Sequence, residues 1–413
     1  MQTELADFMV GTQDGDDAQA IIGKCVHCGF CTATCPTYQL LGDELDGPRG
    51  RIYLIKQMVE GQPVTRGTQL HLDRCLTCRN CETTCPSGVQ YSRLLDIGRR
   101  IVETKVERPM KERVLRYSLA HFVPERRLFS AAMELGRLAR PFLSASLQAK
   151  MPVGQVPRPT PIGHHARKML FLEGCVQPAI SPNINVATRR VLDALGIELI
   201  APASAGCCGA IRLHLSNLDS GLDDIRRNID AWWPYVEQGV EAIVMNASGC
   251  GATVKEYGHL LRDDPVYAEK ANRIVALTKD LAELLPGYVD KLRPLIASPE
   301  RRHVTFHPPC TLQHGQQIKG SVEGLLRSLD IDVRVPSDAH LCCGSAGTYS
   351  ISQPALASQL RNNKVAALEA TEPELIVSAN IGCISHLAAA SKTPVRHWIE
   401  LVDDMLARAH WAG

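Results

Sequence analysis

The chain has 413 residues, and its 45 Lys and Arg residues nearly balance its 44 Asp and Glu residues, which leaves a formal net charge of +1. At roughly 100–200 residues per domain, this length predicts two or three domains, each large enough to bury a core. Balanced charge without a basic block argues against a nucleic-acid partner, because such binding needs clustered Lys and Arg to neutralise phosphates.

The N-terminal residues 1–17 are acidic and lack the positive segment and apolar run of a secretory signal. The chain also lacks a long, predominantly apolar stretch, so we expect no transmembrane helix. We therefore expect a cytoplasmic protein, or one that lies peripherally on the inner face of the cell membrane. In a reducing cytosol the 16 cysteines are better explained as metal or cluster ligands than as disulfides.

Two cysteine runs of the same spacing occupy the first part of the chain. Residues 25–36 and residues 75–86 both read C-x2-C-x2-C-x3-C-P. Three closely spaced thiolates surround one face of an iron–sulfur cubane, and in two-cluster ferredoxins the fourth cysteine of each run ligates the other cluster. The runs therefore predict two [4Fe-4S] clusters with crossed ligands. The first predicted ligand set is Cys25, Cys28, Cys31 and Cys85, and the second is Cys75, Cys78, Cys81 and Cys35.

Zinc is the main alternative for these runs, since C-x2-C motifs also form four-cysteine zinc sites. Such sites typically use two separated pairs, whereas each run here has three cysteines at x2 spacing and a fourth before proline. The zinc alternative would make the chain a stabilised scaffold without a redox role. We favour clusters, and a set of inert buried thiols is the weakest interpretation.

The segment between the runs predicts a capped amphipathic helix over Asp46–Met58. Together with the runs it predicts a mainly helical two-cluster ferredoxin domain over residues 1–110. Three arginines, Arg49, Arg51 and Arg79, are positioned to raise the potentials of anionic clusters, and ordinary surface or capping roles explain them equally well.

Residues 111–164 predict a helical connector followed by a proline-rich linker. Within them, Val114–Leu147 places arginines among Leu, Phe and Met residues, a pattern typical of amphipathic helices, and Pro124 and Pro141 would interrupt one long helix. Such a segment suits an anionic membrane surface, a partner subunit or the following domain, and we favour packing against protein. Met151–Pro161 contains four prolines and predicts the extended linker.

The remainder of the chain repeats one order of elements. The expected strands lie in KMLFLEGC, IELIAP and AIVMNASGC, and then in HVTFHPPC, DVRVP and ELIVSANIGC. The spacing from Cys175 to Cys207 equals the spacing from Cys310 to Cys342, at 32 positions. Strands that alternate with helices predict a duplicated α/β domain with parallel sheets, which makes the chain an α+β multidomain protein. The two predicted repeats cover residues 165–290 and 291–413.

Each repeat places its cysteines after the strand ends, where ligands bind to parallel sheets. Each is therefore a candidate for a further iron–sulfur or zinc site, and matched Cys-Cys-Gly turns favour ligation in at least one repeat. The alternative is that some of these thiols are small buried hydrophobes that pack against the sheet. The candidate ligands are Cys175, Cys207, Cys208 and Cys250 in the first repeat, and Cys310, Cys342, Cys343 and Cys383 in the second. Nearby histidines that are candidate substitutes or ordinary loop residues are His307, His314, His340 and His386.

The chain lacks the motifs of dinucleotide-binding, P-loop, serine hydrolase and zinc protease enzymes. Clusters accept one electron at a time, whereas oxidation of an alcohol removes two, so a flavin or similar cofactor must sit on another polypeptide. The sequence thus predicts an electron-transfer subunit with no catalytic residues of its own.

The double cysteine run followed by two Cys-Cys-Gly units resembles a family of iron–sulfur subunits. That family includes subunits of glycolate oxidase, anaerobic glycerol-3-phosphate dehydrogenase, lactate utilisation and heterodisulfide reductase. The similarity covers nearly the whole chain. Longer stretches, such as CVHCGFCTATCPTYQLLGDELDGPRGRIYLIKQ, LDRCLTCRNCETTCPSGV and HLCCGSAGTY, are most similar to the glycolate oxidase iron–sulfur subunits.

This resemblance implies a bacterial complex in which FAD-bearing subunits oxidise glycolate to glyoxylate, and in which this chain passes electrons to a membrane quinone or another acceptor. Equivalent lactate or glycerol-3-phosphate complexes are the alternatives. One departure from the heterodisulfide reductase type argues against a five-cysteine cluster and against disulfide chemistry. Its C-x-x-C ending is replaced by Cys250-Gly-Ala-Thr253 and Cys383-Ile-Ser-His386, which leaves a four-thiol site or none.

Overall fold

A computed structural model of the protein describes residues 1–140, 159, 163–297 and 303–411. The chain forms two compact units. The first comprises residues 1–117 and 340–364, and the second comprises residues 118–339 and 365–413. The predicted linker Met151–Pro161 lies, apart from Pro159, outside the described residues.

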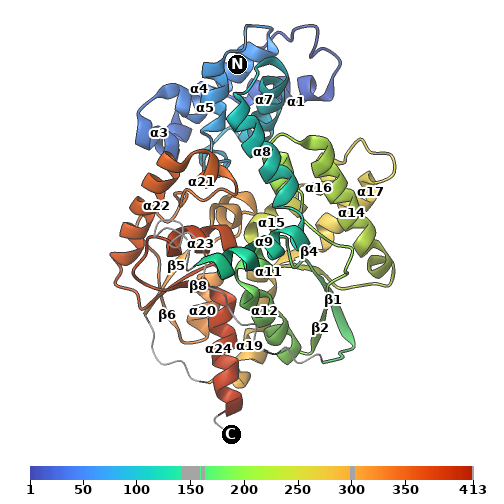
Figure 1. Cartoon of the computed structure of the whole chain (residues 1–413), viewed down its shortest axis with the longest axis vertical. Helices are drawn as coiled ribbons and strands as arrows, with labels where there is room; N and C mark the ends of the chain where they lie inside the picture. Colours follow the sequence, from blue (N-terminus) through green and yellow to red (C-terminus); the bar gives the residue numbers. More distant parts are fainter. Residues whose placement is uncertain (141–158, 160–162, 298–302, 412–413) are drawn as a thin grey trace. The chain divides into compact units, whose positions relative to one another are not determined.

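The N-terminal part of the first unit is helical (Figure 1). Helix α7 packs against α1, α4 and α5, and its Leu94 and Leu95 are fully buried together with Ile22 and Ile55. Apolar residues at helical spacing thus form one core beneath the two cysteine runs. The helices are α1 (Gln13–Lys24), α2 (Phe30–Ala33), α3 (Pro36–Leu41), α4 (Pro48–Val59), α5 (Arg66–Asp73), α6 (Asn80–Thr84) and α7 (Tyr91–Lys105), with a 3₁₀ turn at Glu44–Asp46.

Two helices follow, α8 (Met110–Phe122) and α9 (Arg126–Ala139), and the chain turns between them at Pro124. Within the second unit α9 packs against α11 (Gln177–Ile180), where Arg137 Nη2 donates a hydrogen bond to the carbonyl oxygen of Ala179 at 2.6 Å. The opposite face of α9 is apolar and exposed, with Leu135 and Leu138 at 68% and 75% exposure. Pro141 lies outside the described residues.

Two parallel four-stranded sheets have the same strand order, β2-β1-β3-β4 and β6-β5-β7-β8. The predicted duplication and parallel pairing are therefore confirmed. The last strand of each sheet, β4 and β8, was not among the predicted strands. The strands are β1 (Arg167–Phe171), β2 (Ile197–Ile200), β3 (Ile243–Met245), β4 (Thr278–Asp280), β5 (His303–His307), β6 (Asp332–Arg334), β7 (Leu375–Ser378) and β8 (Val395–His397).

Helices cover the sheets (Figure 1), as is usual for parallel sheets, whose strands are buried on both faces. A shared core joins the two sheets through residues such as Phe171, Val191, Phe306 and Val402. The further helices are α12 (Pro182–Ala194), α13 (Ala210–His214), α14 (Leu218–Glu237), α15 (Ser248–Val254), α16 (Tyr257–Leu260), α17 (Ala268–Leu277), α18 (Leu281–Leu284), α19 (Val289–Leu292), α20 (Ser321–Ser328), α21 (Tyr349–Ser352), α22 (Pro354–Glu369), α23 (Ile381–Ala388) and α24 (Trp398–Trp411). Short 3₁₀ turns at Leu285–Tyr288 and Arg293–Leu295 and a π-helical turn at Thr311–Gly315 complete the elements.

Within the second unit the two repeats meet where β3 and β7 end. The backbone N–H of Ser248 donates to the carbonyl oxygen of Ala379 at 3.0 Å, and the hydroxyls of Ser248 and Thr311 lie 2.7 Å apart. Gln316 Nε2 donates to the carbonyl oxygen of Ser248 at 3.1 Å. The ends of corresponding strands therefore pack together across the duplication.

His397, the last residue of β8, makes the stability of the second unit depend on pH. Burial lowers the pKa of its imidazole to about 3, and its Nδ1 accepts a hydrogen bond from the N–H of Ile399 at 3.1 Å. Because the unfolded chain takes up this proton near pH 6.5, the stability that the neutral ring contributes is present above pH 6.5 and is lost as the pH falls toward 3. We expect this group to lower the unfolding free energy by about 1.4 kcal/mol between pH 7.5 and pH 5.5.

Anaerobic urea unfolding at both pH values checks this expectation, with His397→Gln as the comparison. The variant should lose that part of the pH dependence, whatever its absolute stability. An unchanged pH dependence in the variant would contradict the assignment to His397.

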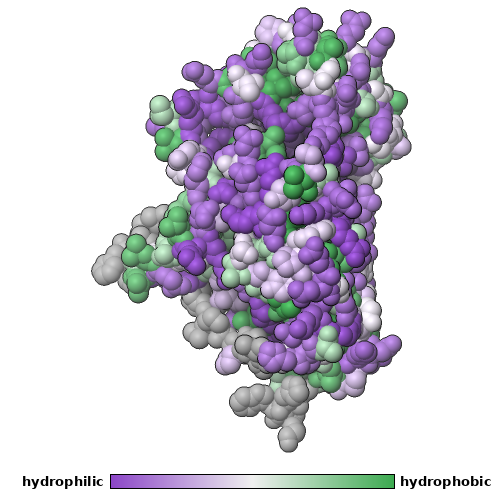
Figure 2. All heavy atoms as spheres, turned by 90° about the vertical axis from the view of Figure 1, so that its right-hand side faces the viewer, coloured by the Kyte–Doolittle hydropathy of each residue, from purple (hydrophilic) through white to green (hydrophobic). Residues whose placement is uncertain are grey.

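No helix among the described residues is long and apolar enough to cross a membrane. The face shown in Figure 2 is mostly hydrophilic, and hydrophobic side chains reach it in small patches.

Candidate iron–sulfur sites

The two cysteine runs adopt the same backbone conformation. A helix ends just before each run, since α1 stops at Lys24 and α5 stops at Asp73. His27 and Thr77 then both have positive φ, at 60° and 53°, which reverses the chain inside each run. Gly29 and Arg79 also share the left-handed conformation, so each loop curls around its first three cysteines before α2 or α6 begins.

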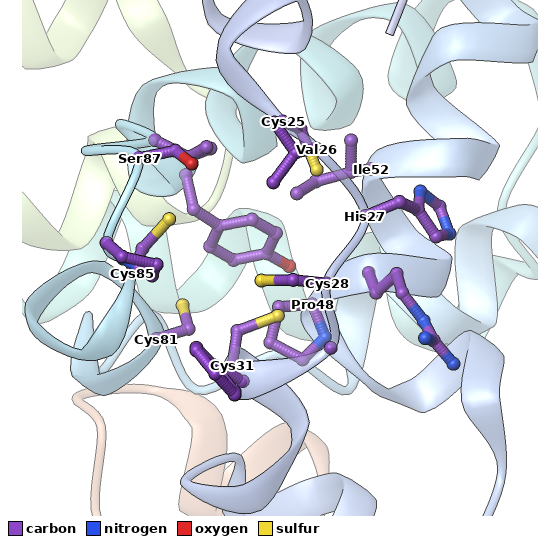
Figure 3. A pocket seen from close by; sticks show the side chains of 16 residues that line it. Cys25, Val26, His27, Cys28, Cys31, Pro48, Ile52, Cys81, Cys85 and Ser87 are labelled. Carbon is purple, nitrogen blue, oxygen red and sulfur yellow. The ribbon is translucent and has the colours of Figure 1, made fainter.

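The first predicted ligand set lines one hollow (Figure 3), which Cys81 of the second predicted set also lines. Three of its thiols come from the first run, and the fourth, that of Cys85, comes from the second run. Burial, together with the nearby thiols of its set, raises the pKa of the Cys31 thiol to about 11. Cys25 is buried and Cys28 is exposed, so this set has one side in solvent. The four members are Cys25, Cys28, Cys31 and Cys85.

The second predicted set lies deeper in the first unit. Burial raises the pKa of the Cys81 thiol well above its ordinary value, and the neighbouring thiols of Cys78, Cys75 and Cys35 act in the same direction. These are the other three members of the predicted set, and again one of the four, Cys35, comes from the other run. Cys35, Cys75 and Cys81 are buried, and Cys78 is partly exposed.

The spacing of the sulfur atoms distinguishes a cluster from a single zinc ion. Ligand sulfurs at about 2.3 Å from a tetrahedral zinc lie about 3.8 Å from one another. Among the His, Cys and acidic residues of the described chain, the groups of three or more that lie within 4.8 Å of one another include none of these eight cysteines. The thiols of neither set are therefore gathered closely enough for one zinc ion, and an all-thiolate set of four is the donor type of a [4Fe-4S] cluster.

A hydrogen bond network contacts the second set. Tyr91 lines the first hollow, and its hydroxyl donates to Cys75 Sγ of the second set at 3.6 Å. The backbone N–H of Thr77 donates to the same sulfur at 3.4 Å. The hydroxyl of Thr37 lies 3.3 Å from Cys35 Sγ. Hydrogen bonds of this kind to ligand sulfurs are one means by which a protein sets a cluster potential.

Arg51 places a buried positive charge near the second set of thiols. Its side chain is 1% exposed, and its Nη1 donates to the Thr37 hydroxyl at 3.2 Å. Its Nη2 lies 3.4 Å from a carboxylate oxygen of the fully buried Asp46. Burial alone would lower the pKa of Arg51, but the surrounding Tyr91, Cys75, Cys35 and Asp46 raise it above its ordinary value, so the guanidinium stays charged.

The other two predicted arginines are paired near the surface. Arg49 forms an ion pair with Glu44 at 2.5 Å, and Arg79 forms one with Glu82 at 2.7 Å. Arg49 also lies close to the first run, since a Cβ added to Gly29 would lie 3.1 Å from Arg49 Nη1. Of the three arginines, Arg51 is therefore the one whose charge is held inside the protein.

Residues 340–364 of the second repeat belong to the first unit and approach the second set. Tyr349 donates a hydrogen bond to the carbonyl oxygen of Arg74 at 3.1 Å, next to Cys75 in sequence. Asn80 Nδ2 donates to the carbonyl oxygen of His340 at 3.0 Å. Burial, with Cys75 as a further cause, raises the pKa of the Tyr349 phenol, so its hydroxyl remains a donor.

The Cys-Cys-Gly turn of this segment is tightly packed. Cys342 and Cys343 are buried, and the N–H of Gly344 donates to Cys342 Sγ at 3.4 Å. Gly344 has a φ of 87°, and an added Cβ would lie 2.6 Å from the carbonyl oxygen of Ala357. Only glycine fits this turn.

The first repeat brings its four candidate thiols together. Cys175 Sγ lies 3.6 Å from Cys207 Sγ, and the thiol of Cys208 forms hydrogen bonds with those of Cys207 and Cys250. A hydrogen bond with Cys207 and then burial raise the pKa of Cys175 well above its ordinary value. The four thiols thus form a continuous chain contributed by three separate turns.

Polar side chains form hydrogen bonds with the backbone of the Cys-Cys-Gly turn in the first repeat. Asn228 accepts a hydrogen bond from the N–H of Gly206 at 2.8 Å and donates to the carbonyl oxygen of Cys207 at 2.7 Å. Tyr257 donates to the carbonyl oxygen of Cys208 at 3.0 Å. The Cys-Cys-Gly turn is therefore fixed through its backbone, which leaves its thiols free to face a ligand.

The remaining candidates of the second repeat lie in the second unit. Cys310 is buried just before the π-helical turn, and Cys383 is buried in α23, where its sulfur accepts a hydrogen bond from Asn380 Nδ2 at 3.7 Å. His307 at the end of β5 and His314 in the π-helical turn are buried. Of the other two predicted histidines, His340 lies in the first unit and His386 lies in α23.

Three contacting residues, Thr37, Tyr91 and Tyr349, were missed from the sequence. Tyr91 and Tyr349 make their contacts through hydrogen bonds between distant parts of the sequence, whereas Thr37 is two residues from Cys35. Thr37 and Tyr349 lie inside stretches that resemble the family, but no spacing rule marks either of them.

Comparison with known families agrees with this division of the chain. Residues 21–89 match the 4Fe-4S dicluster domain, and residues 169–255 and 304–388 each match the cysteine-rich domain. The protein is thus an iron–sulfur protein with a dicluster ferredoxin domain and two cysteine-rich domains.

Comparison with individual relatives shows to which family of iron–sulfur proteins the chain belongs. The chain is 56% identical over 409 residues to the glycolate oxidase iron–sulfur subunit of Escherichia coli strain K12, covering 99% of this chain and 100% of that one. It is 32% identical to the probable glycolate oxidase iron–sulfur subunit of Bacillus subtilis strain 168, covering 87% of each. Lactate utilization protein A of Bacillus licheniformis is 27% identical over 52% of this chain and 87% of its own. The chain belongs to the family of glycolate oxidase iron–sulfur subunits, which confirms the family resemblance.

Proposed function

We propose that this chain is the electron-transfer subunit of a complex that oxidises glycolate to glyoxylate. The main support is the pair of four-thiol sets, each built from three cysteines of one run and one of the other, in a chain 56% identical to a named subunit of that type. FAD and the substrate site reside on partner subunits, and a membrane quinone or another acceptor takes the electrons.

In this proposal the eight cysteines of the two runs ligate two [4Fe-4S] clusters with the crossed pattern described above. Each cluster, when bound, accepts and releases one electron. The chain positions the thiols, keeps water from the deeper set by burying it, and donates hydrogen bonds to Cys75 and Cys35. Two clusters suit a subunit that must take the two electrons of a hydroxy acid one at a time.

We further propose a four-thiol metal site in the first repeat, with Cys175, Cys207, Cys208 and Cys250 as ligands. The sulfurs of Cys175 and Cys207 lie 3.6 Å apart, close to the separation of about 3.8 Å expected around one tetrahedral metal ion. No three of the four thiols lie within 4.8 Å of one another, so the proposal includes an iron–sulfur cluster as well as zinc at this site. Metal beyond about eight iron atoms per chain, lost in Cys208→Ser, would report this site.

The proposed location is the cytoplasm or the inner face of the cell membrane. All 16 cysteines are free thiols, which favours a reducing compartment. The exposed apolar face of α9 is the described element that best suits a peripheral contact.

A lactate-oxidising complex is the second candidate function. The similarity of half of the chain to lactate utilization protein A favours it over other hydroxy acids. The substrate site belongs to the partner subunits in either case, so this chain's own residues do not choose between the two.

Anaerobic affinity purification of the tagged chain tests the proposal. We expect a brown protein with about eight iron and eight sulfide per chain, flavoprotein subunits that co-purify, and paramagnetic resonance signals that appear on addition of glycolate. Reduction by lactate alone would select the second candidate. Stoichiometric zinc without cluster signals would reject the redox function altogether.

A further inference from the structure

The two cysteine runs share one backbone conformation but differ sharply in exposure. In the second run, Leu76 is 5% exposed and Asn80 is 2% exposed. Their counterparts in the first run are Val26, at 69% exposure, and Phe30, at 62%. The duplicated loop is therefore buried in one copy, whereas in the other copy it presents two large apolar side chains to solvent.

The thiol between these apolar side chains is also exposed. Cys28 is exposed, whereas Cys78, its counterpart in the second run, is partly buried. Val26, Cys28 and Phe30 all line the first hollow, so the apolar pair borders the place where the first ligand set meets solvent. In Figure 3 the side chains of Val26 and Cys28 lie beside the same hollow.

Single exposed hydrophobic residues are ordinary on protein surfaces. Here the exposed pair coincides with the most accessible thiol of an electron-transfer site, where a partner must approach for an electron to cross the surface. Its duplicate, which has the same backbone, buries both positions. Apolar side chains of this size are typical of the centre of a protein interface.

We infer that the loop of residues 26–30 is the surface on which the flavoprotein subunit docks to exchange electrons with the first site, an inference that rests on the proposed function. The basic side chains near the loop are Lys24, His27 and Arg49, and Arg49 is paired with Glu44, so the loop carries too little positive charge for an anionic membrane surface. A second copy of this chain would bring only another identical site and no electron donor. In the proposed complex the flavoprotein subunit is the partner that must deliver electrons to this chain, so the exposed apolar loop beside the most accessible thiol is assigned to it.

The test compares the double variant Val26→Glu, Phe30→Glu, and each of its single variants, with Val266→Glu, which places one glutamate at a valine of similar exposure, 61%, in the second unit. Each chain is co-expressed with the flavoprotein subunits and purified anaerobically. Iron content and dithionite reduction show that both clusters are loaded. Three readouts follow: affinity for the flavoprotein subunits, the rate of cluster reduction by glycolate, and hydrogen exchange of residues 26–31 in the complex.

We expect the double variant to bind the flavoprotein subunits about tenfold more weakly or worse, and to be reduced by glycolate correspondingly slowly. Dithionite reduction and iron content should match those of the wild-type chain, and Val266→Glu should match it in all respects. Binding of the flavoprotein subunits should slow exchange in residues 26–31.

The outcomes separate this inference from the function on which it rests. A double variant that binds and is reduced like the wild-type chain overturns the docking surface, and the proposed function stands. A wild-type complex that forms but is not reduced by glycolate overturns the proposed function, and weaker binding of the double variant still supports the surface. Self-association through this loop, or no binding of flavoprotein subunits by the wild-type chain, overturns the inference.

Discussion

Cys85→Ser is expected to remove the cluster of the first run and to leave that of its own run intact. The reason is geometric, since Cys85 is, with Cys25 and Cys28, one of the thiols near Cys31, and all four line one hollow. Cys81 also lines this hollow, but its neighbouring thiols are those of Cys78, Cys75 and Cys35. Serine is a poor ligand for iron at this position, and a cubane that loses one of four thiolates is lost or converted to a smaller cluster. We expect iron to fall by up to about four atoms per chain. Paramagnetic resonance of the reduced chain identifies which cluster signal remains.

The reciprocal variants provide the control. Cys31→Ser should reproduce the spectrum of Cys85→Ser, because both remove the first cluster. Cys35→Ser should reproduce that of Cys81→Ser, because Cys35 and Cys81 belong to the second set. Spectra that group Cys85→Ser with Cys81→Ser would show that each run holds its own cluster, and the crossed assignment would then be wrong.

The parallel architecture could be predicted because it depends on local patterns. Each expected strand was a run of apolar, often β-branched residues followed by a turn, and six of them form the observed sheets. The fourth strands escaped detection because neither β4 nor β8 contains a run of apolar residues. In β4, buried Thr278 and Asp280 flank an exposed Lys279, so neither composition nor periodicity indicates a strand. Pairing with β3 makes this segment a strand.

The surroundings of the thiols could be predicted far less well, because they depend on contacts between distant parts of the chain. The sequence left Arg51 equally open to a surface role or a role near a cluster, and only its packing around Asp46 decides for burial. Tyr349 reaches Arg74 across 275 positions. The exposed Phe30 and the buried Asn80 occupy matching positions of one motif, so spacing alone does not separate the docking loop from its buried duplicate.

Arg51→Gln is expected to lower the reduction potential of the second cluster and to leave that of the first nearly unchanged. The guanidinium is buried, bonded to Thr37, and near Cys75 and Cys35, so its positive charge stabilises the extra electron of a reduced cluster. Glutamine removes the positive charge of Arg51, so the negative charge of the Asp46 carboxylate is less compensated near the cluster. At protein dielectric constants the loss is on the order of 1–2 kcal/mol, or about 50–100 mV for one electron.

Redox titration under anaerobic conditions, followed by paramagnetic resonance, measures both potentials in one sample. Arg51→Lys keeps the charge and should stay within about 20 mV of the wild-type value, although it loses the planar hydrogen bonds. Arg49→Gln is the matched control, because the charge of Arg49 is partly exposed and paired with Glu44, so solvent screening leaves only a small shift of the potential.

Arg51→Gln also breaks a buried ion pair and is expected to lower the stability by about 3–5 kcal/mol, so the titration requires cold, fully loaded protein. Equal potentials in Arg51→Gln and Arg49→Gln would show that the buried charge does not tune the second cluster, and Arg51 would then serve only to anchor Asp46 and Thr37 in the fold.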